Sequence, residues 1–351
     1  MKKIFFAILF LLLPSYIFAC TTFFISSNNA KVFGRNYDFQ IGKGLVIINK
    51  KNVTKESYKD KNGNSIKWTS KYGSVTFNQY GREFPTGGMN EAGLVVELMW
   101  LDGSEYPDDD SRPAIGNLQW IQYQLDNAET VQEVIASDGK IRIGKNNVPL
   151  HYLIADKSGN TAVIEFSEGK MKYRATEDMP FKVLTNDFYS SSVEYLSKFK
   201  EFGGSIELNN TPGSLDRFAK TCKLIKEYNG KEDAVDYSFG VLKSVSQSGA
   251  TQWSIVYDLQ NLKIYFRTLT SPVIKNVSYN NLNFDCASPV KILDVDYDKA
   301  GDVSFAMEDY TNGENYEFIK FAFENVDFLK GTSDAVLRKR SEYPEKFSCN
   351  K

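Results

Sequence analysis

Residues 20–39 read CTTFFISSNNAKVFGRNYDF, and this stretch decides the fold. Two runs rich in aromatic and β-branched residues flank Asn28 and Asn29, which predicts a β-hairpin with its loop at those two asparagines. In that register Arg35 lies within diagonal cross-strand reach of Cys20. The first strand is therefore expected to begin at a cysteine that has an arginine nearby.

The segment before Cys20 resembles a leader. Residues 1–19 carry two lysines, then an apolar run, then Pro14, and they end in Ala19. This layout is typical of a secretory signal peptide, and the run is too short for a membrane-spanning helix of roughly 20 residues. Cleavage after Ala19 would leave Cys20 with a thiol and a free α-amine. That amine titrates near ~8, so it can accept the thiol proton at neutral pH.

Composition excludes several classes of protein. The net charge is −2 with scattered basic residues, which argues against nucleic acid as the main partner. The one basic cluster, residues 338–340, is expected to be solvated surface. No segment after the leader is long and apolar enough for stable membrane insertion. The chain has a single histidine, His151, and no CxxC pair, so metal sites rich in histidine or cysteine are excluded and no cofactor is expected.

The four cysteines are too few for a disulfide framework in a chain of this size. Cys222 lies in an apolar-periodic stretch and is expected to be a buried thiol. Cys286 and Cys349 either pair or stay reduced, and the sequence leaves both open. His151 lies in an apolar strand pattern and is expected to be structural. A thiol that lacks a histidine needs another base, and the α-amine of Cys20 is the candidate.

The rest of the chain shows an antiparallel pattern. Hairpins are expected over residues 151–166 and 253–268, and helices around residues 118–125, 130–136, 192–202 and 214–228, the last with Ser214 as its N-cap. Residues 87–101 are expected to be a glycine-rich turn followed by an apolar strand. Hairpins grouped around paired helices indicate an α+β layered sandwich.

Two further segments complete this prediction. Asp108, Asp109 and Asp110 are expected in an exposed loop, because the spaced ligands of an EF-hand calcium loop are missing. From about residue 270 onward, short strand signals are expected to extend the same sheet system.

Five sequence blocks then point to a family. They are CTTFF at 20–24, GRNYDF at 34–39, GMNEAGL at 88–94, LHY at 150–152 and VLTN at 183–186. In order and spacing they resemble the choloylglycine hydrolase family, which comprises bile salt hydrolases and penicillin V acylases. The resemblance covers residues 20 to about 270. It implies a four-layer αββα sandwich of the N-terminal-nucleophile hydrolase type and a homotetramer. Residues 20–351 are expected to form a single amidase domain with a C-terminal extension from about residue 270.

The resemblance also implies a catalytic set. Cys20 matches the nucleophile, Asn186 matches the oxyanion-stabilising asparagine, and the other matches are Arg35, Asp38 and Arg217. A guanidinium beside a thiol lowers the pKa of the thiol, and a carboxylate can orient the α-amine. From the residues alone, Arg35 and Asp38 fit a buried salt bridge equally well. Asn186 also fits an Asx-turn, and Arg217 fits an ion pair on its own helix.

One position departs from the bile salt hydrolases. Those enzymes carry a second asparagine where this chain has Trp100, and penicillin V acylases carry an aromatic residue there. Trp100, Phe39 and Tyr37 are therefore expected to form an aromatic wall for a phenyl or acyl chain. Ordinary core packing is the alternative, above all for Tyr37. Backbone N–H groups must then complete the oxyanion hole.

The sequence therefore predicts an exported cysteine amidase of the penicillin V acylase type, with a small-molecule linear amide as substrate. N-acyl homoserine lactones are a second substrate class, and periplasm and medium are equally compatible locations. The alternatives are a bile salt hydrolase, a binding protein that has lost turnover, and a lipoprotein lipidated at Cys20. Phe18 disfavours the lipoprotein, because a small residue is expected there.

Overall fold

The predicted hairpin is present and lies at the centre of the molecule. The computed structural model describes residues 19–27, 30–145, 147–208 and 211–350. Strand β1 (Thr21–Ser27) pairs antiparallel with β2 (Ala30–Asp38), and Thr22 lies opposite Arg35. Arg35 is therefore diagonal to Cys20, as predicted. The predicted loop at residues 28 and 29 lies outside the described residues, as does most of the predicted leader.

The hairpin belongs to the first of two large sheets. Among the described residues this sheet has seven strands, in the order β14 (Val183–Leu184), β1, β2, β15 (Thr251–Asp258), β16 (Lys263–Thr268), β17 (Lys275–Ser278) and β19 (Gly301–Asp302). The β15–β16 pair is one of the two hairpins predicted further along the chain.

The second sheet lies against the first. Over the same described ranges it has nine strands, in the order β13 (Lys170–Ala175), β12 (Thr161–Ser167), β11 (Leu150–Ala155), β8 (Val95–Trp100), β7 (Pro85–Asn90), β6 (Ser74–Asn78), β3 (Leu45–Asn49), β18 (Lys291–Asp294) and β20 (Glu308–Asp309). Its β11–β12 pair is the other predicted hairpin.

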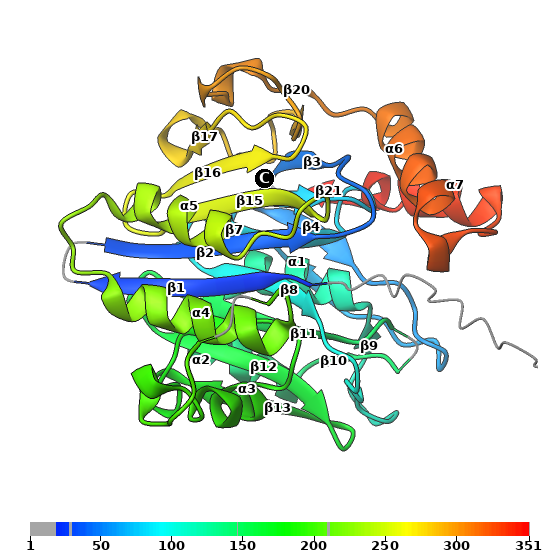
Figure 1. The fold of residues 1–351 in the computed structure, drawn as a ribbon. Coiled ribbons are helices and arrows are strands. Elements are labelled where there is room, and N and C mark those ends of the chain that lie inside the picture. Colours follow the sequence, from blue (N-terminus) through cyan, green and yellow to red (C-terminus); the bar gives the residue numbers. More distant parts are fainter. Residues whose placement is uncertain (1–18, 28–29, 146, 209–210, 351) are drawn as a thin grey trace, which may run out of the picture.

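Helices cover both outer faces (Figure 1). On the seven-stranded sheet lie α3 (Tyr189–Leu196), α4 (Ser214–Glu227) and α5 (Ala234–Ser244); on the nine-stranded sheet lie α1 (Asn117–Asn127) and α2 (Val131–Ala136). One cluster of buried side chains joins the facing sheets, and a second fills the space under α1 and α2. This is the four-layer αββα sandwich that the sequence predicted.

Several predicted local features are wrong. The expected helix over 192–202 ends at Leu196, and a short 3-10 turn follows it. Helix α5 was not predicted. Ser214 is the first residue of α4 and its N-cap is Gly213, so the hydroxyl of Ser214 serves other contacts. Gly87 and Gly88 lie inside β7 and form no turn, because the chain reverses later, at residues 90–93.

The C-terminal part only partly follows the prediction. Residues 275–309 add strands to both large sheets, as expected. Residues 312–341 instead form α6 (Asn312–Asn325) and α7 (Asp334–Ser341), which lie at one side of the sandwich (Figure 1). A disulfide joins Cys286 to Cys349, so these two cysteines pair. It lies beside a small sheet of β4 (Val53–Glu56), β5 (Lys67–Thr69) and β21 (Ser348–Cys349).

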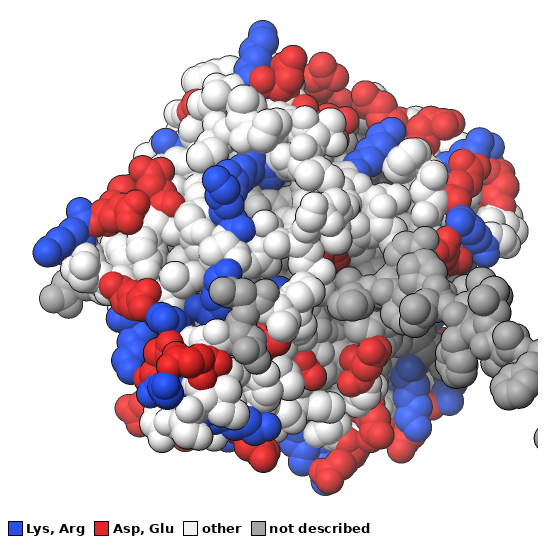
Figure 2. Space-filling view, in the orientation of Figure 1, with Lys and Arg blue, Asp and Glu red and all other residues white. Residues whose placement is uncertain are grey.

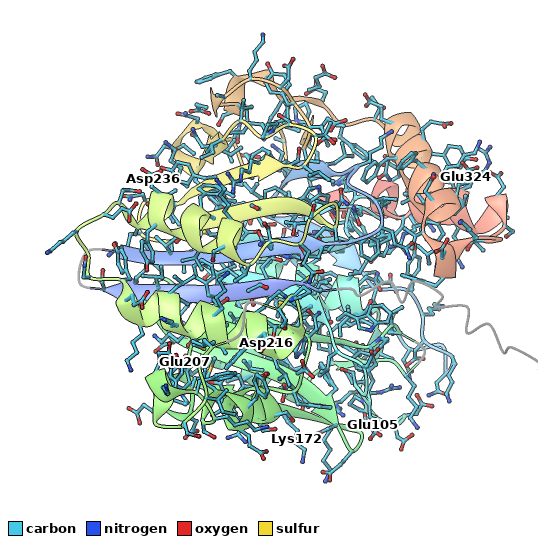
Figure 3. The ribbon with its side chains drawn as sticks, in the orientation of Figure 1. Glu105, Lys172, Glu207, Asp216, Asp236 and Glu324 are labelled. Atoms are coloured by element: carbon cyan, nitrogen blue, oxygen red, sulfur yellow. A yellow bond between two sulfur atoms is a disulfide. The ribbon has the colours of Figure 1, made fainter. Side chains whose placement is uncertain are left out.

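Acidic and basic side chains are mixed over the visible face of the molecule (Figure 2). On the face in Figure 2, lysine and arginine alternate with aspartate and glutamate, and no broad field of one sign appears. Figure 3 shows labelled charged residues such as Glu105, Lys172 and Glu324 at the edge of the molecule. Over the described ranges, no helix combines the length and the apolar character that a bilayer crossing requires.

Gly87 tests how tightly the Glu97 side chain fits beside the neighbouring strand of its own sheet. A Cβ at this position would collide with the Glu97 carboxylate, whereas a Cβ at Gly240 in α5 would meet open space. We expect Gly87→Ala to lower the free energy of unfolding by about 2–4 kcal/mol, through overpacking beside a buried ion pair. Gly240→Ala, the control, should be neutral or stabilise the helix by up to about 1 kcal/mol. Equal urea denaturation curves for the two variants would contradict this account.

Candidate active site

Cys20 is buried directly before β1 and lines a cavity of roughly 570 Å³. Its Sγ lies 4.0 Å from the backbone oxygen of Asp38. Burial raises the pKa of the Cys20 thiol; the charge of Arg35 lowers it and the charge of Asp38 raises it again. Arg35 thus acts in the predicted direction, but burial outweighs it while Cys20 is joined to the buried Ala19.

Asp38, at the end of β2, presents a buried carboxylate to the same cavity. One oxygen, Oδ1, accepts a hydrogen bond from the Thr251 hydroxyl. The other, Oδ2, has no hydrogen-bond partner among the described residues. Burial raises the pKa of Asp38 to about 7, although Thr251 and the charges of Arg217 and Arg35 lower it. A buried oxygen without a partner is costly unless a donor reaches it.

Arg217 reaches across from α4 to the residue that carries the thiol. Its Nη1 donates to the Cys20 backbone oxygen and to the Thr21 hydroxyl, both at 2.6 Å. Its Nη2 donates to Asn186 Oδ1 at 3.0 Å. Arg217 therefore contacts the candidate site directly, and the alternative of an ion pair confined to its own helix does not describe it.

Asn186 is held in one orientation by its neighbours. Because its Oδ1 faces Arg217, its Nδ2 must be the donating side, and one N–H bonds to the Trp100 backbone oxygen at 2.9 Å. The Asn186 backbone N–H donates to the Ser214 hydroxyl at 2.9 Å. Ser214, predicted as a cap, thus fixes the position of Asn186 instead.

Arg35 points between the two sheets and forms an ion pair with Glu97 of β8. It also donates to the backbone oxygens of Thr86 at 3.1 Å and Leu98 at 3.2 Å. Tyr257 donates to the other Glu97 oxygen. Burial raises the pKa of Glu97 to about 7, against the lowering effects of Arg35 and of the Tyr257 hydrogen bond.

Glu97 was missed in the sequence, although a signal for it exists. It is the single charged residue within VVELMW, residues 95–100, a strand that is otherwise apolar. A carboxylate inside such a strand requires a buried partner. The neighbouring glycine at position 87 supplies the space that this carboxylate occupies.

The three predicted wall residues all line the cavity. Tyr37 is also core: it is buried, its ring stacks on Trp253 and Phe39, and its hydroxyl donates to Gln79 at 2.7 Å. Trp100 is half-buried, and its indole N–H donates to Asp102 at 2.7 Å. Tyr37 is therefore both a residue of the cavity wall and a residue of the core.

His151 is fully buried, and its Nε2 lies 2.7 Å from the backbone oxygen of Thr185. Its other ring nitrogen lies 3.6 Å from Glu165. Thr185 directly precedes Asn186, so the contact with His151 helps to hold the chain at Asn186 in place. This fits the structural role expected for His151. It does not line the cavity that contains Cys20.

The aspartates at 108–110 lie in an exposed loop, as predicted. Asp109 pairs with Arg142 at 2.6 Å and also with Lys61, and Asp110 pairs with Arg112 at 2.6 Å. These carboxylates therefore neutralise nearby basic residues. The described part of the chain holds no group of three or more histidines, cysteines or carboxylates that could bind a metal ion.

Comparisons with known proteins place the chain in a family. Residues 20–292 match the model of the linear amide C–N hydrolases, choloylglycine hydrolase family. The chain belongs to this family. A penicillin V acylase from Pectobacterium atrosepticum is 28% identical over 263 residues, which are 63% of this chain and 69% of the relative.

Solved structures of the choloylglycine hydrolase family share the fold. A penicillin V acylase from Agrobacterium tumefaciens superposes with a TM-score of 0.73 and 27% identity, over 83% of this chain and 98% of that one. A mutant of a conjugated bile acid hydrolase from Clostridium perfringens gives 0.66 and 20%, over 80% and 98%. The protein is thus a linear amide C–N hydrolase, similar to penicillin V acylases and bile salt hydrolases.

The Arg35–Glu97 pair predicts how the thiol responds to pH. Above pH 7 the Glu97 carboxylate offsets the charge of Arg35, and below pH 6 it is largely protonated. In Glu97→Gln samples whose circular dichroism shows the native fold, iodoacetamide should therefore alkylate Cys20 about threefold faster than in wild type at pH 8, and at nearly the wild-type rate at pH 6.

Mass spectrometry of the Cys20 peptide would follow the alkylation reaction. Tyr257→Phe is the comparison: it keeps the Glu97 carboxyl but removes a hydrogen bond that lowers the pKa of Glu97, so it should speed alkylation at pH 8 less than Glu97→Gln does. A rate ratio for Glu97→Gln that stays flat between pH 6 and pH 8 would overturn this interpretation.

Proposed function

We propose that this hydrolase is exported and uses Cys20 as its nucleophile after removal of residues 1–19. One observation carries the proposal: polar groups surround Cys20, which lines the cavity. The Asp38 backbone oxygen lies 4.0 Å from the thiol, and the Asp38 carboxylate borders the same cavity. The Arg217 guanidinium donates to the Cys20 backbone oxygen, and the Asn186 amide accepts from Arg217. Cleavage after Ala19 would convert the peptide nitrogen of Cys20 into an α-amine.

The first half of the reaction forms a thioester. The α-amine of Cys20 takes the thiol proton, directly or through a water, and the thiolate attacks the carbonyl carbon of the amide. Asp38 Oδ2 accepts a hydrogen bond from the resulting ammonium. The second N–H of Asn186 Nδ2, together with a backbone N–H, stabilises the oxyanion. The ammonium then protonates the leaving nitrogen, the C–N bond breaks and the amine departs.

The second half returns the enzyme to its starting state. The α-amine takes a proton from water, and the hydroxide attacks the thioester carbonyl. The C–S bond breaks, the acid is released and the thiol regains its proton. Arg217 holds the Cys20 carbonyl throughout, which keeps the amine and the thiol in fixed positions.

Phenoxymethylpenicillin is the first substrate to test. Its acyl half is aromatic, and the cavity carries Trp100, Phe39 and Tyr37. Long-chain N-acyl homoserine lactones come next and conjugated bile salts third. Bile salt hydrolysis is the alternative function, and release of taurine or glycine would identify it.

Export and assembly belong to the same proposal. Disulfides persist in oxidising compartments, and the pairing of Cys286 with Cys349 favours periplasm or medium. Intact mass separates the amidase from a lipoprotein, because lipidation would add mass at Cys20 and block both functional groups. The resemblance to the family also suggests a homotetramer, which sedimentation velocity would test.

Three chains test the nucleophile: one that begins at Cys20, the same chain with Cys20→Ala, and one that retains Ala19 before Cys20. We expect only the first to release phenoxyacetate from phenoxymethylpenicillin, because the other two lack the thiol or the free amine. Circular dichroism should show the same fold in all three. Turnover by either of the other two chains would refute the mechanism, as would an exported protein that begins elsewhere.

Asn186→Ala removes the proposed oxyanion donor. We expect kcat to fall about 10²- to 10³-fold with little change in KM, because the donor acts in the transition state. Asn261→Ala, in the exposed turn between β15 and β16, is the matched control and should retain wild-type kinetics. A similar kcat for both variants would assign Asn186 a structural role only.

A further inference from the structure

Helices α6 and α7 lie beyond residue 292, where the match to the family ends, yet they reach the cavity that contains Cys20. Four residues of this C-terminal segment line the cavity: Phe323, Phe328, Leu329 and Arg340. We propose that residues 312–350 form the outer wall of the acyl site, and that Phe328 selects amides with long apolar acyl chains. This inference rests on the proposed function.

The wall has a core of its own, which joins it to the sandwich. Ile319, Ala322 and Phe323 of α6 pack in one buried cluster with Tyr80 and Phe84 from the segment between β6 and β7. This packing buries the apolar face of α6 against residues that also border the cavity. The position of α6 is therefore coupled to the shape of the site.

Polar contacts fix the same wall near Asp38. Gln40, two residues after Asp38, accepts from the Asp327 backbone N–H at 3.0 Å and donates to the Asp327 carboxylate at 3.4 Å. Arg340 donates to the Tyr80 backbone oxygen at 2.7 Å, and its guanidinium lies 3.5 Å from the centre of the Phe84 ring. Phe328, next to Asp327, is thus held close to the end of β2.

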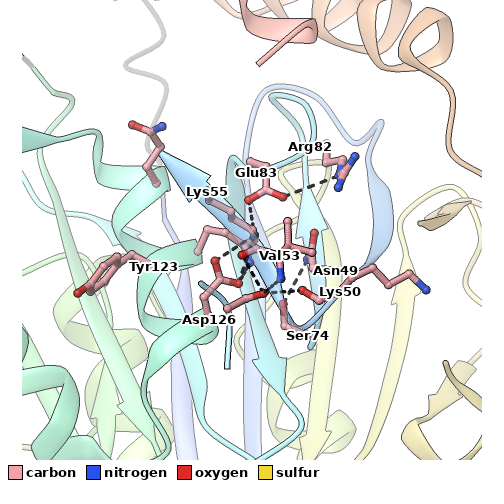
Figure 4. A network of polar contacts seen from close by, with 12 residues as sticks. Asn49, Lys50, Val53, Lys55, Ser74, Arg82, Glu83, Tyr123 and Asp126 are labelled. Carbon is pink, nitrogen blue, oxygen red and sulfur yellow. Dashed lines mark hydrogen bonds and ion pairs between the residues drawn. The ribbon is translucent and has the colours of Figure 1, made fainter. Parts of the chain in front are cut away.

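The far end of the segment is also anchored. Strand β21 pairs with β4, and the Cys286–Cys349 disulfide ties it to the chain before β18. Strand β4 is itself fixed by Lys55, whose ammonium lies between Glu83 at 2.6 Å and Asp126 at 3.0 Å (Figure 4). Tyr343 adds a hydrogen bond to the Glu56 backbone oxygen at 2.8 Å. The wall is therefore held at both ends.

The chemistry of the wall fits an apolar acyl group. The Phe328 ring lies 6.1 Å from the Trp100 ring, so the two aromatic side chains border one stretch of the cavity. Phe328 is 45% exposed, and covering its surface with an apolar ligand is favourable. The acyl half stays bound to Cys20 through both steps, whereas the amine leaves after the first. A wall that must hold its ligand until the end therefore suits the acyl half.

Phe328→Ala tests this wall, with Phe328→Leu as a conservative variant. Phe305→Ala is the matched control, because Phe305 is 83% exposed and lies outside the cavity. We expect Phe328→Ala to lower the ratio of kcat/KM for N-dodecanoyl over N-hexanoyl homoserine lactone about fivefold or more. Phe328→Leu should restore most of that ratio, and Phe305→Ala should leave it unchanged.

A binding measurement separates this inference from the proposed function. In the Cys20→Ala background, calorimetry should show dodecanoate binding weakened about fivefold by Phe328→Ala, with hexanoate affected much less. Dodecanoate binding that depends on Phe328, together with no turnover by the chain that begins at Cys20, would support the wall and reject the amidase. An unchanged chain-length ratio and unchanged dodecanoate binding in Phe328→Ala would overturn the wall even if the enzyme is active.

Discussion

The ion pair between Arg35 and Glu97 is the constraint around which the sandwich is built. It joins β2 of one sheet to β8 of the other, and both side chains are fully buried. A buried pair adds little net stability over apolar packing, but a partner left alone is strongly destabilising. The glycine at 87 and the Tyr257 hydroxyl complete its surroundings. The two sheets therefore meet in the one register that satisfies these groups.

That register also determines which groups lie near Cys20 in the candidate site. The same β2 strand carries Arg35 in its middle and Asp38 at its end, so the strand that pairs Arg35 with Glu97 also places the Asp38 backbone oxygen 4.0 Å from the Cys20 thiol. Burial raises the pKa values of Cys20 and Asp38 together. Burial thus disfavours the ionised forms of both groups. A free α-ammonium on Cys20 would add a positive charge that favours those ionised forms, as the proposed reaction requires.

Much of this arrangement follows from local sequence. The hairpin at residues 20–39, the two later hairpins and the layered architecture all follow from alternation and turn residues, which act over short distances. Glu97 could not be placed in the same way, since its partner lies 62 residues away in the sequence. The glycines of β7 resemble a turn in the sequence. In the structure, the small size of Gly87 instead makes room for the Glu97 carboxylate of the neighbouring strand. Ser214 resembles an N-cap in the sequence. Its hydrogen-bond partners, Thr185 and Asn186, belong to a distant segment, so local sequence could not reveal them.

The C-terminal helices could not be placed from local sequence either, and their proposed role differs from that of the residues around Cys20. Residues 312–341 carry no sequence block of the family, and their role depends on where the chain returns in space. The proposed chemistry uses residues 20–217, whereas the outer wall comes from a segment that a disulfide holds in place. Export would then complete two parts of the enzyme: cleavage would free the amine of Cys20, and an oxidising compartment would close the Cys286–Cys349 bond. The wall lies outside the matched family region, whereas Cys20, Asp38 and Asn186 lie inside it. In this proposal, substrate preference depends on the C-terminal wall together with Trp100, Phe39 and Tyr37, whereas bond cleavage depends on residues 20–217.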